Sequence, residues 1–270
     1  MRALRTAGFL AMLIVFGSTL TGCKTREGRE GPMTDPQVVY ERAKRAVLQG
    51  DYPFAIRVYE ALMARYPFAE ETRQSRLDVI YAYYRAGEAD SAIDAADTFI
   101  RENPTHPRID YAWYLKGLVD FERMPNFLER WFRVDLNQRP PTNARRSFAA
   151  FATVVQQFPT SDYAHDSRRR MVYLRNRLAD YELAVARYYV DRGAYVAAAQ
   201  RAKVAVEEFD GSPAVREALE IMVYCYEKMD LPELADKTRV MYRANYDAEI
   251  GEGTSEPVTK RKWYKLWLAT

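Results

Sequence analysis

One recurring pattern constrains the fold of this chain more than any other feature. A glycine is followed, at intervals typical of one helix face, by an alanine, a second small or aromatic residue, an aliphatic residue, and a proline or aspartate. Three copies occur: Gly50, Ala55, Tyr59, Met63 and Pro67; Gly87, Ala92, Ala96, Ile100 and Pro104; Gly193, Ala198, Ala202, Val206 and Asp210. Ala55 and Ala92 are 37 residues apart, close to the tetratricopeptide period of about 34.

Each position in the pattern has a physical role in a pair of helices. Glycine permits the sharp turn between the two helices, alanine lets them approach closely, and proline ends the unit because it cannot continue a helix. A single hairpin cannot bury its apolar face alone, so stacked hairpins build one continuous core. The predicted fold is therefore an all-α solenoid with a concave face.

A third unit of the pattern is interrupted. Trp113 and Gly117 belong to its first helix, and Phe148 and Phe151 to its second. The insertion between them, residues 123–142, contains aromatic residues and prolines. Long loops in compact domains are usually functional or disordered, and the aromatic content argues against disorder. The insertion either has a function of its own or caps the neighbouring groove.

The remaining chain predicts further helices. A helix around Tyr163 to Leu178 precedes the Gly193 unit, and a last pair lies near Val215–Met229 and Leu231–Tyr246. About five hairpins result. We divide them into amino-terminal repeats, residues 36–160, and carboxy-terminal repeats, residues 161–246.

The amino terminus carries an export signal. Arg2 and Arg5 precede an apolar run, and Leu20-Thr21-Gly22-Cys23 forms a lipobox. We expect a signal peptide over residues 1–22, lipidation at Cys23 and a tether over residues 23–35. No aspartate follows the cysteine, which favours the periplasmic face of the outer membrane. The alternative is an ordinary signal peptide with a chance cysteine.

Composition favours a binding protein over an enzyme. Without residues 1–22 the chain has 38 basic and 37 acidic residues, so nothing indicates nucleic acid. His106 and His165 lie too far apart in sequence for a regular metal site, and no phosphate loop or hydrolase motif occurs. Cys225 is expected to be a buried apolar residue. We expect no catalysis, cofactor or metal.

The carboxy-terminal residues 247–270 differ from the repeats. Gly251–Pro257 reads as a flexible spacer, and Lys260–Trp267 joins basic and aromatic residues. This tail either docks on a membrane surface or a partner, or is frayed.

Several stretches make a narrower match to a known family. They are Arg65-Tyr66-Pro67-Phe68, Leu77–Tyr84, Asn103–Pro107, Arg177–Glu182 and Arg192–Ala197. With the lipobox and the interrupted third unit, they resemble the BamD lipoproteins of the β-barrel assembly machinery, from about Cys23 to Tyr246. The resemblance implies a periplasmic adaptor. Its amino-terminal repeats would receive the carboxy-terminal signals of unfolded outer-membrane proteins, and its carboxy-terminal repeats would bind the periplasmic domains of BamA and companion Bam lipoproteins.

Candidate client-binding residues follow from that role. Tyr66, Phe68, Tyr81 and Tyr84 offer flat apolar surfaces, and the three tyrosines add hydroxyl groups. The guanidinium groups of Arg65, Arg73 or Arg76 suit a terminal carboxylate. The alternative for Tyr81 and Tyr84 is a place in the core of the second hairpin.

One arginine is the candidate partner contact. The resemblance implies that Arg201 meets an acidic residue of BamA, and a planar guanidinium suits a carboxylate. Its small neighbours Ala198, Ala199 and Ala202 would leave it free to reach outward. The alternative is a loose pair with a glutamate on the same helix.

Two rival functions remain open. Another lipoprotein scaffold, such as one for pilus assembly, would share the repeats. A cell-wall hydrolase would need a compact domain with a catalytic glutamate, and only 24 residues follow Tyr246.

Overall fold

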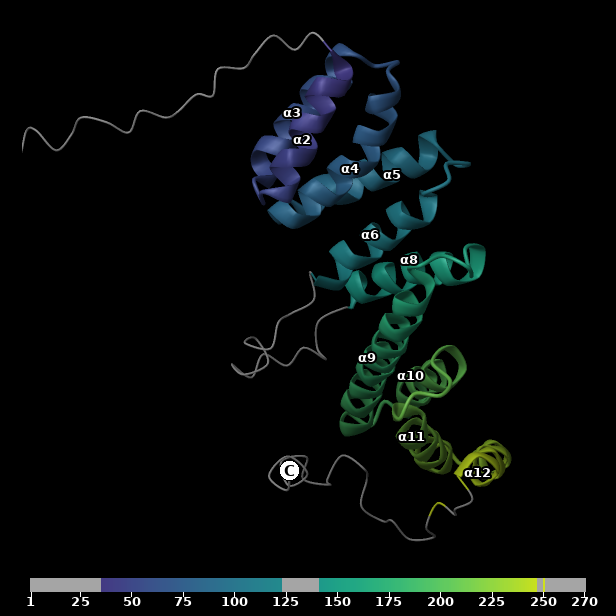
Figure 1. The fold of residues 1–270 in the computed structure, drawn as a ribbon. Coiled ribbons are helices and arrows are strands. Elements are labelled where there is room, and N and C mark those ends of the chain that lie inside the picture. Colours follow the sequence, from purple (N-terminus) through teal and green to yellow (C-terminus); the bar gives the residue numbers. More distant parts are fainter. Residues whose placement is uncertain (1–34, 123–140, 247–249, 251–270) are drawn as a thin grey trace, which may run out of the picture.

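The computed structural model describes residues 35–122, 141–246 and 250, and these form ten α-helices without a strand (Figure 1). The helices are α2 (Pro36–Leu48), α3 (Tyr52–Arg65), α4 (Glu70–Ala86), α5 (Ala89–Glu102), α6 (Ile109–Glu122), α8 (Thr142–Gln157), α9 (Ala164–Asp191), α10 (Tyr195–Glu208), α11 (Ala214–Lys228) and α12 (Pro232–Tyr246).

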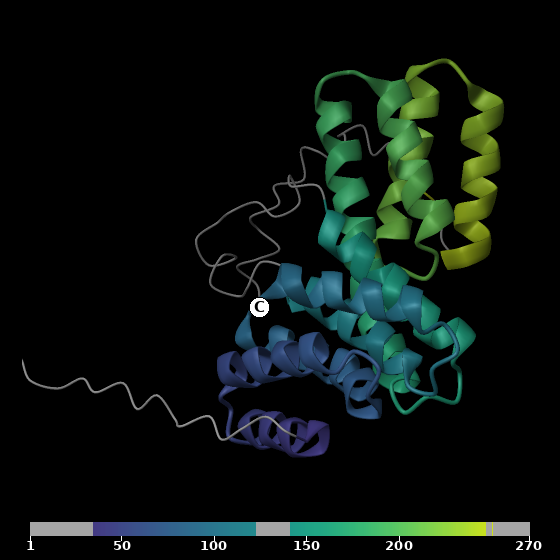
Figure 2. The ribbon, with the colours of Figure 1, turned by 90° about the horizontal axis from the view of Figure 1, so that it is seen from above.

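The helices stack as five consecutive hairpins. Each helix packs on the next, and α9 additionally contacts α11. The first hairpin, α2 and α3, and the last, α11 and α12, lie at opposite ends of the molecule (Figures 1 and 2). The prediction of an all-α helical-repeat solenoid is confirmed.

Turn geometry explains the recurring glycines. Gly87 ends α4 with φ 78°, in the left-handed region, and its N–H donates to the carbonyl of Tyr84 at 3.2 Å. A residue with a Cβ would be strained there. Gly117 is needed for close packing and not for a turn, because a Cβ on it would lie 2.6 Å from the ring of Phe151. That glycine lets α8 approach α6 despite the insertion between them.

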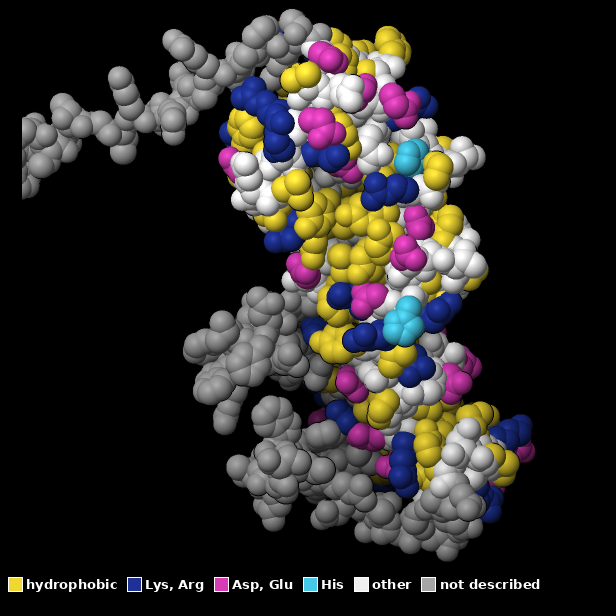
Figure 3. All heavy atoms as spheres, in the orientation of Figure 1, with side chains coloured by type: hydrophobic (Ala, Val, Ile, Leu, Met, Phe, Trp, Pro, Cys, Tyr) yellow, Lys and Arg dark blue, Asp and Glu magenta, His cyan; other side chains and the backbone are white. Residues whose placement is uncertain are grey.

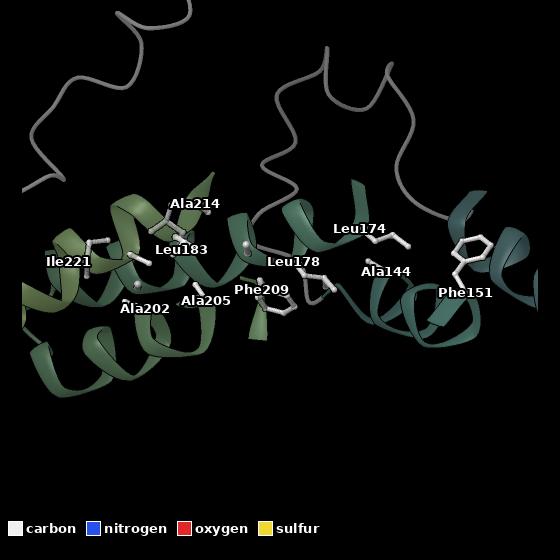
Figure 4. Packing of buried hydrophobic residues seen from close by; sticks show 14 of the residues in the cluster. Ala144, Phe151, Leu174, Leu178, Leu183, Ala202, Ala205, Phe209, Ala214 and Ile221 are labelled. Atoms are coloured by element: carbon white, nitrogen blue, oxygen red, sulfur yellow. The ribbon is translucent and has the colours of Figure 1, made fainter. Parts of the chain in front are cut away.

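The core consists of two apolar clusters that both include residues of α4. Ala55, Ala92, Ala198 and Ala202 are each fully buried, as the repeat pattern predicts. One apolar cluster extends from α4 to α12, and a second joins α2, α3 and α4. Figure 4 shows side chains from α8, α9, α10 and α11 meeting in one apolar layer.

One predicted boundary was wrong. The helix expected to end near Leu178 continues to Asp191. No proline or glycine interrupts residues 164–191, and buried residues recur at helical spacing through Leu183, Ala186 and Val190. After the predicted insertion 123–142, helix α8 begins at Thr142. Residues 123–140, the lipobox and residues 251–270 lie outside the described part.

Candidate protein-binding site

A cleft of about 200 Å³ opens between the first two hairpins and the start of α6. Its lining comes from four helices and the turn before α6: Lys44, Val47, Leu48, Tyr59, Asp78, Tyr81, Arg108 and Tyr111. Figure 3 shows hydrophobic side chains gathered on the molecular surface around α6. We call the space lined by these eight residues the cleft.

Aromatic rings extend the cleft on both sides. The ring of Tyr81 lies 6.4 Å from that of Tyr52 and 6.3 Å from that of Tyr84. The ring of Tyr163 lies 5.2 Å from that of Tyr111 and, stacked, 4.7 Å from that of Tyr114. These rings are partly buried against the core, so each presents only part of its surface.

Cations accompany these rings. The guanidinium of Arg85 lies over the rings of Tyr52 and Tyr81, and that of Arg108 lies 5.0 Å from the ring centre of Tyr111. Arg85 also donates to the hydroxyl of Tyr81 at 2.7 Å. Stacking of this kind holds a guanidinium in place while its edge stays in water.

The one carboxylate in the cleft lining is already engaged. Asp78 accepts hydrogen bonds from the hydroxyl of Tyr40 at 2.8 Å and from the amide of Gln74 at 2.9 Å. Burial and this hydrogen bond raise the pKa of Tyr40 above its usual range. The exposed charges that line the cleft are the cations Lys44, which pairs with Glu41 at 3.3 Å, and Arg108. Such a surface suits an apolar segment that carries a carboxylate.

The structure separates the predicted client-binding residues. Tyr66 and Phe68 lie in the turn before α4, and the side chain of Phe68 is 99% exposed. Tyr81 and Tyr84 lie in the last turns of α4, about 15–20 Å further along the axis at 1.5 Å per residue. Tyr81 lines the cleft, and Tyr84 donates its hydroxyl to Glu122. Both also pack on the core.

The predicted carboxylate-binding arginines have partners within the chain. Arg73 pairs with Glu70 and Arg76 with Glu102, and Arg65 lies over the ring of Tyr66. Arg65, Arg73 and Arg76 are all absent from the cleft lining. Arg108 and Tyr111, which line the cleft, were not among the predicted site residues. Both follow the Asn103–Pro107 turn, and only the stacking of the hairpins brings them beside Tyr81.

A polar contact ties α6 to α9 beside the aromatic rings. Asp166 accepts from the hydroxyl of Tyr114 at 2.8 Å and from Nε of Arg170 at 2.5 Å. Burial and the bond to Asp166 raise the pKa of Tyr114 to about 12. Burial opposes ionisation of Asp166, but the bonds from Arg170 and Tyr114 outweigh it and lower the pKa of that carboxyl. The contact fixes the third hairpin against the fourth.

Arg201 neither reaches freely outward nor pairs with a glutamate on its own helix, the two arrangements expected from the sequence. Its guanidinium donates to Oε2 of Glu182 at 3.0 Å, and Arg145 donates to Oε1 at 2.7 Å. The Glu182 side chain is 1% exposed, whereas those of Arg145 and Arg201 are 46% and 44% exposed. Glu182 lies on α9, so the pair joins two helices and is not intrahelical. The small residues of α10 bring α9 close enough for this contact, so the guanidinium is not free.

Other predicted polar residues have structural roles. Cys225 is fully buried, and burial raises the pKa of its thiol to about 12. Nδ1 of His106 accepts from the backbone N–H of Arg108 at 3.1 Å, which supports the turn before α6. Within residues 35–122 and 141–246, no group of three or more potential metal ligands occurs. Among the described helices, none is both long and apolar enough to cross a membrane.

Sequence comparison with known proteins finds relatives over most of this chain. A family model described as "YfiO: Outer membrane lipoprotein" matches residues 32–241. The outer membrane protein assembly factor BamD of Neisseria gonorrhoeae is 36% identical over 96% of this chain and 98% of its own length. BamD of Vibrio cholerae is 34% identical over 88% of this chain and 97% of its own length. Among solved structures, a MamA protein covers 80% of this chain and 97% of its own at 16% identity, with a TM-score of 0.34.

Proposed function

The chain belongs to the YfiO family of outer membrane lipoproteins, to which BamD belongs, and we propose from this premise that it is a non-catalytic adaptor in outer-membrane protein assembly. It receives unfolded β-barrel clients on its first hairpins and docks on BamA and companion Bam lipoproteins through its later ones. Lipid on Cys23 anchors it to the periplasmic face of the outer membrane.

The cleft is the observation that carries the client-binding proposal. A barrel signal is an extended segment that ends in an aromatic residue and a carboxylate. Tyr81 and Tyr111 offer ring faces for the aromatic side chain, and the exposed guanidinium of Arg108 suits the carboxylate. Tyr66, Phe68 and Arg65 lie at the other end of α4, where they meet a more distant part of the client.

Docking on BamA uses the surface around Arg201. Among the described residues its guanidinium makes one hydrogen bond, to Glu182, and nearly half of the side chain is exposed. A guanidinium has five donors, so Arg201 donates to a second carboxylate from its outer edge. Glu182 and Arg145 then hold Arg201 in position instead of competing with the partner.

Photo-crosslinking tests client binding at the cleft. The mature chain carries a crosslinking residue at position 81 or, as a matched control, at position 240, because Val240 is 58% exposed on the distant α12. The probe is a peptide of a barrel's last strand with a free carboxylate. We expect capture at position 81 to fall about tenfold or more when that carboxylate is amidated, because the amide loses one charge-assisted hydrogen bond. Equal capture at both positions, or of a scrambled peptide, would reject the cleft as the client site.

A further inference from the structure

Charge is unevenly distributed along this nearly neutral chain. Residues 141–180 contain seven basic and three acidic residues, whereas residues 35–122 contain 11 and 15, and residues 181–246 contain 9 and 11. All seven basic residues within 141–180 are arginines. The middle of the solenoid is therefore basic and both flanks are acidic.

The first half of α9 exposes one regular stripe. Between Ala164 and Leu178 the exposed residues are His165, Arg168, Arg169, Val172 and Tyr173. Their spacing of i, i+3, i+4, i+7 and i+8 places them on a single helix face. The opposite face is buried, with Leu174 and Leu178 in the core. We call these five residues the α9 stripe.

Among the described residues no carboxylate forms an ion pair or hydrogen bond with the α9 stripe, although the charge of Arg169 helps to lower the pKa of the nearby Asp166. Arg168 and Arg169 have no ion pair or hydrogen bond with any described residue outside the helix backbone. The carboxylate nearest in sequence, Asp166, is bonded by Arg170 and Tyr114. Solvated helix faces usually alternate the sign of charge at these spacings. The α9 stripe instead keeps two like charges side by side.

Apolar surface lies one helical turn after the two arginines of the stripe. Val172 is 50% and Tyr173 44% exposed. The ring of Tyr173 lies 5.6 Å from that of Phe121, and the guanidinium of Arg170 lies 4.8 Å from the same Phe121 ring. Arginine and tyrosine are enriched at protein interfaces, whereas lysine is depleted. This composition favours a protein partner over solvent.

We propose that the α9 stripe docks an acidic polypeptide segment whose apolar side chains cover Val172 and Tyr173. The arginines would bind its carboxylates with two hydrogen bonds each, and the aromatic contact would exclude water around them. An anionic lipid surface shares the charge but is the weaker candidate, because apolar side chains on one narrow helix face suit a single segment. The proposal does not depend on the cleft or on Arg201.

Fluorescence anisotropy with the mature chain tests the proposal. The probe is a labelled peptide of alternating glutamate and leucine. We expect R168E/R169E to weaken binding at least tenfold without changing the melting temperature by more than a degree. The matched control R45E/K237E makes the same change in net charge at exposed residues on α2 and α12. It should weaken binding twofold or less. Y173S should also weaken binding, and should leave its salt dependence unchanged because the arginines remain.

Four results would overturn the proposal. The first is that the peptide fails to bind the wild type in low salt. The second is that R168E/R169E binds the peptide as tightly as the wild type does. The third is that the control R45E/K237E loses as much affinity as R168E/R169E. The fourth is that the chain binds vesicles of phosphatidylethanolamine and phosphatidylglycerol in a way that requires Arg168 and Arg169, but does not bind the peptide. The stripe would then be a lipid site.

Discussion

At the scale of single residues, Glu182 links three helices through one carboxylate. Each of its oxygens accepts from a different arginine, Arg145 of α8 and Arg201 of α10. Removing one member of such a group leaves the others unsatisfied, and this costs more than the contacts contribute. The half-exposed arginines recover part of that loss by hydration.

Glu182→Gln therefore lowers the free energy of unfolding by about 1–3 kcal/mol. The amide has one acceptor, and its NH₂ faces a guanidinium that also donates. Urea unfolding measures the change. Glu208→Gln is the control, because Glu208 is 56% exposed and 3.8 Å from Arg145, a pair worth under about 1 kcal/mol. Equal effects of the two substitutions would show that Glu182 does not organise the contact.

At the scale of helices, the repeat pattern predicted pairing well and missed one boundary. Ala55, Ala92 and Ala198 were identifiable because a helix contact needs a small residue at one repeated place. The length of α9 was missed, although no proline or glycine interrupts residues 164–191 and the buried residues keep helical spacing throughout. The cleft was found only in part, since its lining depends on how successive hairpins stack.

Ala92→Leu tests the helix contacts directly. Ala92 is fully buried on α5, and extra methylene groups in a packed contact cost about 1–3 kcal/mol. Ala64→Leu on α3 is the control, because Ala64 is exposed, and such surface changes stay within about 0.5 kcal/mol. Chemical denaturation of both variants gives the comparison. If Ala92→Leu unfolds at the same denaturant midpoint as the wild type, Ala92 does not lie at a close contact between helices.

At the scale of the whole molecule, buried tyrosines lower the free energy of unfolding as the pH becomes alkaline. Burial raises the pKa of eight of them, Tyr40, Tyr59, Tyr83, Tyr84, Tyr111, Tyr114, Tyr224 and Tyr246. The unfolded chain releases these protons near pH 10, before the folded chain does. Their stabilisation is therefore complete below about pH 10 and is lost as pH rises toward 12 and beyond.

We expect the urea midpoint to be lower at pH 11 than at pH 8, and phenolate absorbance to rise together with loss of helicity. The buried thiol of Cys225 acts in the same direction, so Cys225→Ala should remove only a small part of the effect. Ionisation of all 20 tyrosines near pH 10 with the helices intact would contradict the burial seen here.

The central claim is that this chain assembles outer-membrane proteins through its cleft. The most direct measurement depletes the native chain from its own cells, supplies variants, and quantifies folded β-barrels in the outer membrane. Wild type should restore them, whereas Y81E/Y111E should not, although it remains membrane-associated and helical. Normal barrel assembly by Y81E/Y111E, or in depleted cells without any supplied chain, would contradict the account.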